Sequence, residues 1–299
     1  MSTILVTGAG GFIGKFVVHE FLNRNDHVIV VVRNKNSYQK LQKESVLEAD
    51  LSNLDIEELK SSIGMEQIEA CIHLAWEGIP DYSYQVSKKN LMMGMNVLEL
   101  CRQLKIAHVV MSGSCWEYAN PSGAVAEQDP LTAHNGFTAA KNALRSMCEA
   151  FCKENHMHYH WLRFFYVYGP GQKEKSLIPM IVKSMKEGNL PKLSGAYNRN
   201  DFIFVEDVAK AVAKTVEVNP KESILNVGTG TGTCVLDIVK KIGESLNFPV
   251  DAEEFQRNAA PASFWADQTV SKQALLWQPE YSIEQGIEEY LLWEHRNGK

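Results

Sequence analysis

Short apolar runs alternate with amphipathic stretches along the first half of the chain. Runs rich in β-branched residues predict buried strands near residues 3–7, 27–32, 46–49, 70–74, 108–112 and 160–165. Between them, apolar positions at helical spacing predict helices near 12–24, 56–63, 85–104 and 135–154. Such alternation is typical of parallel strands joined by right-handed crossovers, so we expect an α/β fold with a Rossmann-type doubly wound sheet.

The pattern changes at residue 169, where a polar, turn-rich segment begins. After it we expect a helix at 178–187, a strand at 202–205, a helix at 206–216, a strand at 224–227 that returns to the main sheet, and a closing helix at 283–293. We therefore predict two domains. Residues 1–168 plus 206–228 would bind a dinucleotide, and 169–205 plus 229–299 would form a smaller substrate-binding lobe over the carboxyl ends of the strands.

Composition narrows the class of protein. The 299 residues carry a net charge of −6 without a basic cluster, which argues against a nucleic-acid partner. There is neither an apolar run of the ~20 residues needed to span a bilayer nor a signal-peptide pattern, so we expect no membrane association. Six cysteines lie apart without a C-x-x-C pair, which favours packing over metal binding and a reduced, cytoplasmic enzyme.

The first predicted turn carries the pattern of a dinucleotide site. Gly8, Gly11 and Gly14 follow an apolar strand and open a helix, an arrangement that binds a pyrophosphate against backbone N–H groups. Other residues fall in the same turn or at the ends of later strands, where a dinucleotide would lie. The expected additional cofactor contacts are Phe12, Ile13, Asp50, Leu51, Leu74, Ala75, Trp76 and Phe164.

The end of the second strand bears on the choice of cofactor. An acidic residue there would accept a hydrogen bond from the ribose 2′-hydroxyl of NAD, but this chain has Arg33, Asn34 and Lys35. Two cations without a carboxylate favour a 2′-phosphate, so we predict that NADP(H) is preferred over NAD(H). The alternative is that Arg33 and Lys35 are solvated loop charges.

Together with the glycine turn, four further segments complete a family pattern: NLMMGMN at 90–96, SGSCWEY at 112–118, LRFFYVYGPG at 162–171 and DFIFVED at 201–207. Trp277 and Pro279 add to it. With these motifs the chain resembles extended short-chain dehydrogenases/reductases of the NAD-dependent epimerase/dehydratase type, which act on nucleotide sugars. The resemblance covers nearly the whole length, and it implies a homodimer paired through the helices at 85–104 and 135–154.

The resemblance also implies the catalytic residues. In the family, a serine or threonine and a tyrosine hydrogen-bond the reacting sugar oxygen, and a lysine four residues after the tyrosine holds the nicotinamide ribose and lowers the pKa of the tyrosine. These positions fall on Ser114, Phe137 and Lys141. The i, i+4 spacing of the last two places both side chains on one face of a helix.

Phe137 breaks the family pattern because a phenyl ring offers no proton. Loss of a positioned acid–base group typically lowers the rate by ~10²–10⁴-fold. Three explanations stay open: an engineered Tyr-to-Phe substitution, a natural variant that uses Ser114, water or another acid, or a catalytically silent homologue that only binds or senses its ligands.

The residues after Ser114 indicate the reaction class. Dehydrating and decarboxylating members carry acidic residues where this chain has Cys115 and Trp116. Glu117 lies one position further on, where strand alternation points its side chain away from Ser114 and indicates a structural role. What remains is reduction of a C4 ketone, with a CDP- or dTDP-linked 4-keto-6-deoxy sugar as the nearest substrate, or 4-epimerisation with retained NAD. The NADP(H) preference favours the reductase.

The family also implies substrate contacts from Ser114, Cys115 and Trp116, and two of its positions differ here. Tyr166 replaces the usual asparagine, and Asn200, beside Arg199, replaces an arginine that reaches the diphosphate. Arg257 matches a second diphosphate-binding arginine, and Asp267 follows it at the family's distance. We therefore expect a nucleotide sugar as the substrate, with its base and sugar undetermined.

Overall fold

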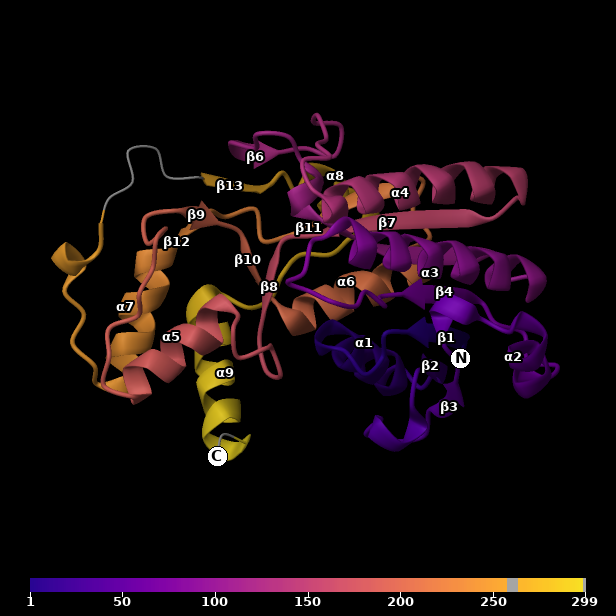
Figure 1. Ribbon diagram of the computed structural model, residues 1–299, viewed down its shortest axis with the longest axis horizontal. Helices are drawn as coiled ribbons and strands as arrows, with labels where there is room; N and C mark the ends of the chain where they lie inside the picture. Colours follow the sequence, from indigo (N-terminus) through magenta and orange to yellow (C-terminus); the bar gives the residue numbers. More distant parts are fainter. Residues whose placement is uncertain (257–262, 298–299) are drawn as a thin grey trace.

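A seven-stranded, fully parallel sheet lies at the centre of the protein, with strand order β11-β7-β5-β4-β1-β2-β3 (Figure 1). The computed structural model describes residues 1–256 and 263–297 of the chain. The strands are β1 (Thr3–Thr7), β2 (His27–Val32), β3 (Ser45–Glu48), β4 (Ala70–His73), β5 (His108–Ser114), β7 (His158–Phe164) and β11 (Ile224–Val227).

Helices cover both faces of this sheet. One face packs against α1 (Phe12–Asn23), α6 (Val205–Val218) and α8 (Thr269–Leu275), and the other against α2 (Ile56–Ile63), α3 (Tyr84–Gln103) and α4 (Gly136–Glu154). Along β1, Ile4 and Val6 belong to the first core and Leu5 to the second, since successive side chains point to opposite faces. Burial on both faces explains why the strands are continuous apolar runs, and the predicted doubly wound α/β fold is confirmed.

A second group of helices stands beside the sheet and has its own apolar core (Figure 1). It consists of α5 (Leu177–Lys186), α7 (Val235–Leu246) and α9 (Ile283–Asn297). Two small sheets join the groups: β10 (Phe202–Phe204) with β8 (Tyr166–Tyr168), and β12 (Thr233–Cys234), β9 (Arg199–Asn200), β13 (Ser263–Ala266) and β6 (Gly123–Val125) in that order. The exact division into two domains stays a prediction.

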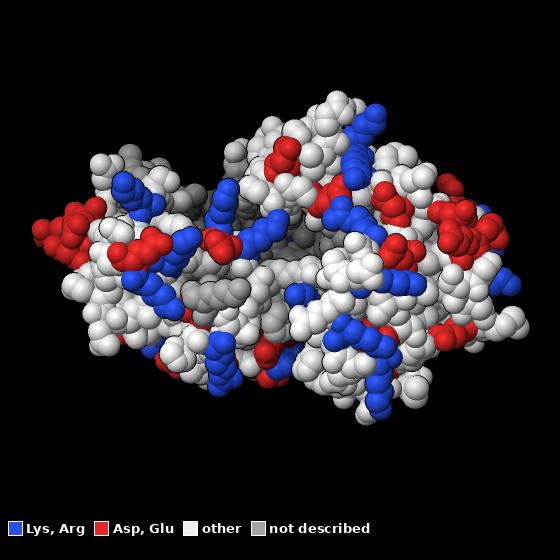
Figure 2. All heavy atoms as spheres, turned by 60° about the horizontal axis from the view of Figure 1, so that its bottom comes forward, with Lys and Arg blue, Asp and Glu red and all other residues white. Residues whose placement is uncertain are grey.

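The surface carries charges of both signs, and the cysteines lie in the interior. Acidic and basic side chains are interspersed over the face in Figure 2, and Lys and Arg side chains lie beside the hollow at its centre. All six cysteines are buried free thiols. Within residues 1–256 and 263–297, no helix has the length and apolar character required to cross a membrane.

Candidate active site

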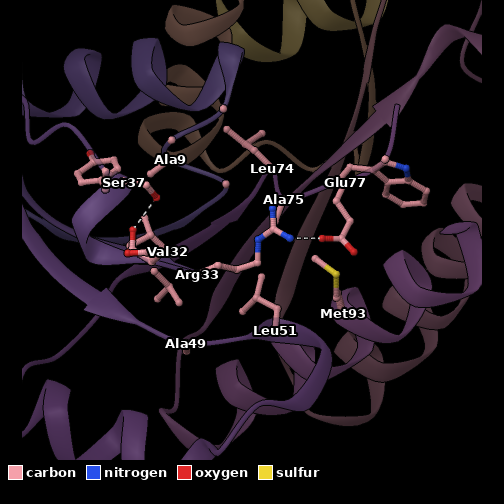
Figure 3. A pocket seen from close by; sticks show the side chains of 18 of the residues that line it. Ala9, Val32, Arg33, Ser37, Ala49, Leu51, Leu74, Ala75, Glu77 and Met93 are labelled. Carbon is pink, nitrogen blue, oxygen red and sulfur yellow. Dashed lines mark hydrogen bonds and ion pairs between the residues drawn. The ribbon is translucent and has the colours of Figure 1, made fainter. Parts of the chain in front are cut away.

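A cavity of about 670 Å³ opens at the carboxyl ends of β1, β2 and β4 (Figure 3). This is the edge of a doubly wound sheet at which ligands bind. Eight of the predicted cofactor residues line it: Gly8, Gly11, Arg33, Asn34, Leu51, Leu74, Ala75 and Trp76. The other predicted cofactor residues, Phe12, Ile13, Gly14, Lys35, Asp50, Lys141 and Phe164, are not among its lining residues.

The glycine turn has the close backbone approach that a pyrophosphate site needs. Gly8 has φ +76°, and a Cβ there would lie 2.6 Å from the backbone nitrogen of Ala75. At Gly14, a Cβ would overlap the carbonyl oxygen of Gly8. Gly11 is the N-cap of the 12-residue helix α1, whose first N–H groups therefore face the cavity edge. The residues present thus fit the pyrophosphate of a dinucleotide.

Arg33 does not lie free in this cavity. Its Nη1 is 2.5 Å from Oε2 of Glu77, and Lys89 Nζ is 2.5 Å from Oε1 of the same carboxylate. Figure 3 shows the Arg33–Glu77 pair across the cavity, with Leu51 and Met93 below it. The carboxylate that the sequence lacks at the end of β2 is therefore supplied by the segment after β4.

Lys35 and Asp50 lie beside a different, smaller cavity of about 250 Å³. The backbone nitrogen of Lys35 donates to the Glu48 carboxylate at 2.7 Å. The Asp50 carboxylate accepts from the Ser52 nitrogen at 2.9 Å and the Ser52 hydroxyl at 2.7 Å, which lowers the pKa of Asp50. The second cation on which the NADP(H) prediction depends thus lines the neighbouring cavity, which shares Ala49 with the cofactor cavity.

Ser114 ends β5 and caps a short 3-10 turn, Cys115–Glu117. Its Oγ accepts a hydrogen bond from the Trp116 nitrogen at 3.2 Å. The Ser114 nitrogen donates to Oε1 of Glu117 at 2.8 Å. The prediction that Glu117 points away from Ser114 is wrong, because the chain leaves the strand geometry at Ser114 and the turn brings the carboxylate back beneath it.

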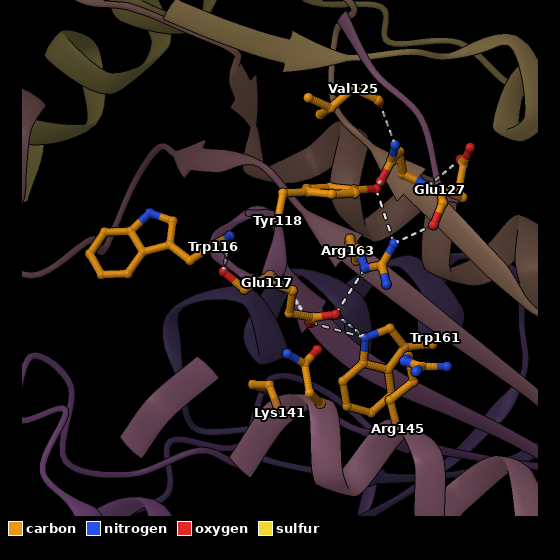
Figure 4. A network of polar contacts seen from close by, with 12 residues as sticks. Trp116, Glu117, Tyr118, Val125, Glu127, Lys141, Arg145, Trp161 and Arg163 are labelled. Carbon is orange, nitrogen blue, oxygen red and sulfur yellow. Dashed lines mark hydrogen bonds and ion pairs between the residues drawn. The ribbon is translucent and has the colours of Figure 1, made fainter. Parts of the chain in front are cut away.

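Glu117 belongs to a buried polar network (Figure 4). The Glu117 carboxylate accepts from Arg163 Nε at 2.8 Å and from Trp161 Nε1 at 3.0 Å, and both Glu117 and Arg163 are almost fully buried. Arg163 also donates to the Tyr118 hydroxyl at 3.1 Å, and Tyr118 donates to Asn226 at 2.6 Å. Removing one partner of a buried ion pair typically costs about 3–5 kcal/mol. The network holds Glu117 in place, and the Glu117 carboxylate in turn binds the backbone nitrogen of Ser114.

Phe137 is the second residue of α4 and is only 6% exposed. Three aromatic rings surround it: Trp76 at 5.4 Å, Tyr82 at 5.5 Å and Trp116 at 6.3 Å between centroids. The three rings come from the segment after β4 and from the turn after Ser114, so the predicted catalytic positions converge in space.

Lys141 lies one helical turn after Phe137 and is buried. Its Nζ donates to the Ser112 carbonyl at 2.6 Å and lies 3.9 Å from the centroid of the Trp76 ring. Burial lowers the pKa of Lys141 to about 7, and Glu117 opposes that shift. An amine of this pKa exchanges protons near neutral pH, which suits acid–base chemistry.

Besides the residues of the Ser114 turn, the predicted substrate residues Tyr166 and Asn200 lie in β8 and β9. Tyr166 packs against Phe202 and Phe264 at 5.7 and 6.0 Å between centroids, and its side chain is hydrogen-bonded to Trp116. Asn200 lies in β9, paired with Thr233 and Phe264. Arg199 donates to the Gly232 carbonyl at 3.0 Å. Cys115 is buried, and burial raises the pKa of its thiol. Arg257 lies outside the described residues.

Several residues of this site were missed from the sequence, and two of them matter most for its chemistry. Glu77 and Tyr82 both lie between β4 and α3, a segment without apolar periodicity. The available signal was local: Glu77 directly follows Trp76, a predicted cofactor residue, so its carboxylate was a candidate for the same cavity.

The model of the NAD dependent epimerase/dehydratase family matches residues 4–228. A putative UDP-glucose 4-epimerase of Methanocaldococcus jannaschii is 27% identical over 314 aligned positions, which cover 99% of each chain. CDP-abequose synthase of Salmonella typhimurium is 26% identical, with 96% of this chain and 97% of that protein covered. The fold is similar to that of a UDP-glucose 4-epimerase of Thermotoga maritima solved with UDP-glucose, with a TM-score of 0.86, 23% identity and coverage of 99% and 100%.

The matched family segment spans the glycine turn, the Ser114 turn, helix α4 and strand β11. It therefore includes the cofactor cavity and the three predicted catalytic positions, and the resemblance and enzyme class expected from the motifs are confirmed. The chain belongs to the NAD dependent epimerase/dehydratase family.

Proposed function

We propose that this chain is a nucleotide-sugar 4-epimerase that uses a bound NAD. The observation that carries the proposal is the pairing of Arg33 with Glu77 in the cofactor cavity. This pairing neutralises the cation expected to hold a 2′-phosphate, and Lys35 lies beside another cavity. The pairing of Arg33 weakens the argument for NADP(H), and with it the argument for net reduction.

The residues of the site would have distinct roles in such a reaction. The glycine turn around Gly8 and Gly11 would hold NAD, which would supply a reversible hydride acceptor for C4 of the sugar without net oxidation. Ser114 would hydrogen-bond the C4 oxygen, held in place by its contact with Glu117. Trp116 is 37% exposed beside Ser114 and would offer an aromatic face to the sugar ring.

The neighbours of Ser114 argue against the dehydrating and decarboxylating reactions of the family. Loss of water needs an acid and a base at the reacting carbons, but Cys115 is a buried thiol of raised pKa and Trp116 has no acidic group. A relative that matches over nearly its full length is described as a putative UDP-glucose 4-epimerase. Both points favour a reaction confined to C4.

The test starts with the cofactor that accompanies the purified protein. We expect denaturation of the purified protein to release NAD(H). Incubation of the protein with UDP-glucose should yield UDP-galactose, and incubation with UDP-galactose should yield UDP-glucose. UDP-, dTDP- and CDP-linked glucose and galactose would be compared by liquid chromatography. Failure to interconvert any of these pairs, with no bound NAD(H), would contradict the proposal.

The second candidate is an NADPH-dependent reductase of a CDP- or dTDP-linked 4-keto-6-deoxy sugar. It is favoured by the 65% exposed side chain of Arg33 and by the lack of a carboxylate at 33–35. CDP-abequose synthase, at 26% identity, is a relative of similar closeness. Oxidation of NADPH on addition of a 4-keto-6-deoxy nucleotide sugar, without epimerase activity, would establish this function instead.

A further inference from the structure

Tyr82 lies beside Phe137, the position at which the family carries a tyrosine. Tyr82 lies in the segment between β4 and α3, and this segment touches the start of α4. At Gly136, the residue before Phe137, a Cβ would lie 2.9 Å from both the carbonyl oxygen of Tyr82 and the carbonyl carbon of Ser83. The backbone of Tyr82 is therefore held against the helix that carries positions 137 and 141.

The ring of Tyr82 is turned toward the catalytic cluster. Its centroid is 5.5 Å from the Phe137 ring and 5.2 Å from the Trp116 ring. Trp116 follows Ser114 by two residues, and Phe137 precedes Lys141 by four. Tyr82 is half-buried, so its phenol belongs to the cluster and still has access to a ligand. Burial raises the pKa of this phenol, which keeps it protonated at neutral pH.

Three other titratable side chains near Phe137 are engaged in the described structure. The Lys141 amine donates to the Ser112 carbonyl at 2.6 Å and lies over the Trp76 ring. Glu117 accepts from Arg163 and Trp161 in the buried network. Tyr166 is bonded to Trp116. Tyr82 is thus the phenol best placed to stand in for a tyrosine at 137.

We propose that Tyr82 transfers the proton between enzyme and sugar in place of the tyrosine that Phe137 replaces. The inference rests on the proposed function. In the oxidation step, the O4–H bond breaks and its proton passes to the phenol oxygen of Tyr82 as the phenol releases its own proton to solvent, which the half-buried side chain reaches; the C4 hydride would go to the bound cofactor. In the return step, Tyr82 gives a proton to O4 and regains one from solvent as the hydride returns to C4, so atoms and electrons balance over the cycle.

The test is to remove the phenol and to transplant it. We expect Tyr82→Phe to lower kcat for epimerisation by ~10²–10⁴-fold, the range for loss of an acid–base group, with KM changed less than about threefold. The double variant Tyr82→Phe with Phe137→Tyr should recover most of kcat, because the phenol is restored on the other side of the same cluster. Tyr84→Phe is the matched control: Tyr84 is 67% exposed two residues away, and kcat should not change.

Other results of this experiment would overturn the role of Tyr82. Tyr82→Phe with the kcat of the unmodified chain would overturn the assignment. An inactive natural chain together with an active Phe137→Tyr variant would overturn it as well, while leaving the proposed function intact. Inactivity of both proteins on UDP-, dTDP- and CDP-linked sugars would overturn the proposed function and the role of Tyr82 with it. Retained NAD(H) and an unchanged melting temperature would show that each variant is folded.

Discussion

Glu77 places a carboxylate in the cofactor cavity, paired with Arg33. Its carboxylate pairs with both Arg33 and Lys89 at 2.5 Å, and it would oppose a 2′-phosphate that competes for Arg33. We predict that Glu77→Gln strengthens binding of NADP(H) relative to NAD(H) by about tenfold, or ~1.4 kcal/mol, because Arg33 becomes free to pair with the phosphate. Calorimetric titration of both cofactors measures this ratio.

Glu48→Gln is the control for that experiment. Glu48 accepts the Lys35 nitrogen at 2.7 Å beside the smaller cavity, so its neutralisation should leave the ratio of affinities unchanged. An unaltered ratio in Glu77→Gln would mean that Glu77 does not oppose a 2′-phosphate. Stronger binding of NADP(H) than of NAD(H) by the unmodified chain would favour the reductase.

Arg33 and Glu77 also show how far single residues of the site can be predicted from the sequence. Ser114, Phe137 and Lys141 were proposed because their segments match the motifs of the family, and the i, i+4 spacing of the last two places them on one helix face. The Arg33–Glu77 pair joins residues 44 positions apart, and neither periodicity nor a motif links them. Sequence reasoning therefore identified the cation and missed the carboxylate that neutralises it.

Elements with a single apolar period were predicted closely. The bounds of β1, β2, α2 and β11 agree with the predicted ranges, because each is a continuous buried run or a strongly amphipathic helix. The two- and three-residue strands β8, β9 and β12 were not predicted, since so short a run carries no measurable alternation. Helices α7 and α8 were not assigned separately within the expected lobe.

Strands β5 and β7 are joined by a buried histidine pair that makes the sheet sensitive to acid. His108 Nε2 is 2.7 Å from His160 Nδ1, and His160 Nε2 donates to the Pro220 carbonyl at 2.9 Å. Burial, followed by the charges of His160 and His158, lowers the pKa of His108 to about 3. Burial also lowers the pKa of His160. Both rings are therefore neutral in the folded protein.

The sign of the resulting pH dependence follows from linkage. Between about pH 6.5 and pH 3, His108 is protonated in the unfolded chain but neutral in the folded protein. The free energy of unfolding therefore falls as the pH falls through this window. We predict that His108→Asn reduces the slope of the unfolding free energy against pH by about 1.4 kcal/mol per unit between pH 4 and 6, measured by urea unfolding. The exposed His19→Asn should retain the original slope; equal slopes in all three proteins would refute the assignment.

At the level of the whole molecule, the cofactor cavity and the aromatic cluster depend on segments that the sheet brings together. The glycine turn, the segment after β4, the turn after β5 and the start of α4 all lie at the carboxyl ends of parallel strands. The doubly wound order places these ends at one edge, which is why a predicted topology located the site. It could not orient side chains within connecting segments, because those follow turn geometry rather than strand alternation, as Glu117 shows.

The last prediction concerns the outer surfaces of α3 and α4, which pack side by side on the sheet (Figure 1). Met92 and Met147 on these helices are 49% and 47% exposed, and Leu91, Met95 and Phe151 are only partly buried. Apolar side chains held in water on two adjacent helices favour pairing with a second copy, which buries the same surface twice. We therefore expect light scattering at micromolar concentration to give twice the 33.6 kDa mass of the chain.

The variant Met92→Glu with Met147→Glu should be monomeric, because four buried carboxylates would oppose one interface. Leu292→Glu on α9, where the leucine is 50% exposed, is the control and should stay dimeric. A monomeric mass for the unmodified chain would exclude this mode of assembly.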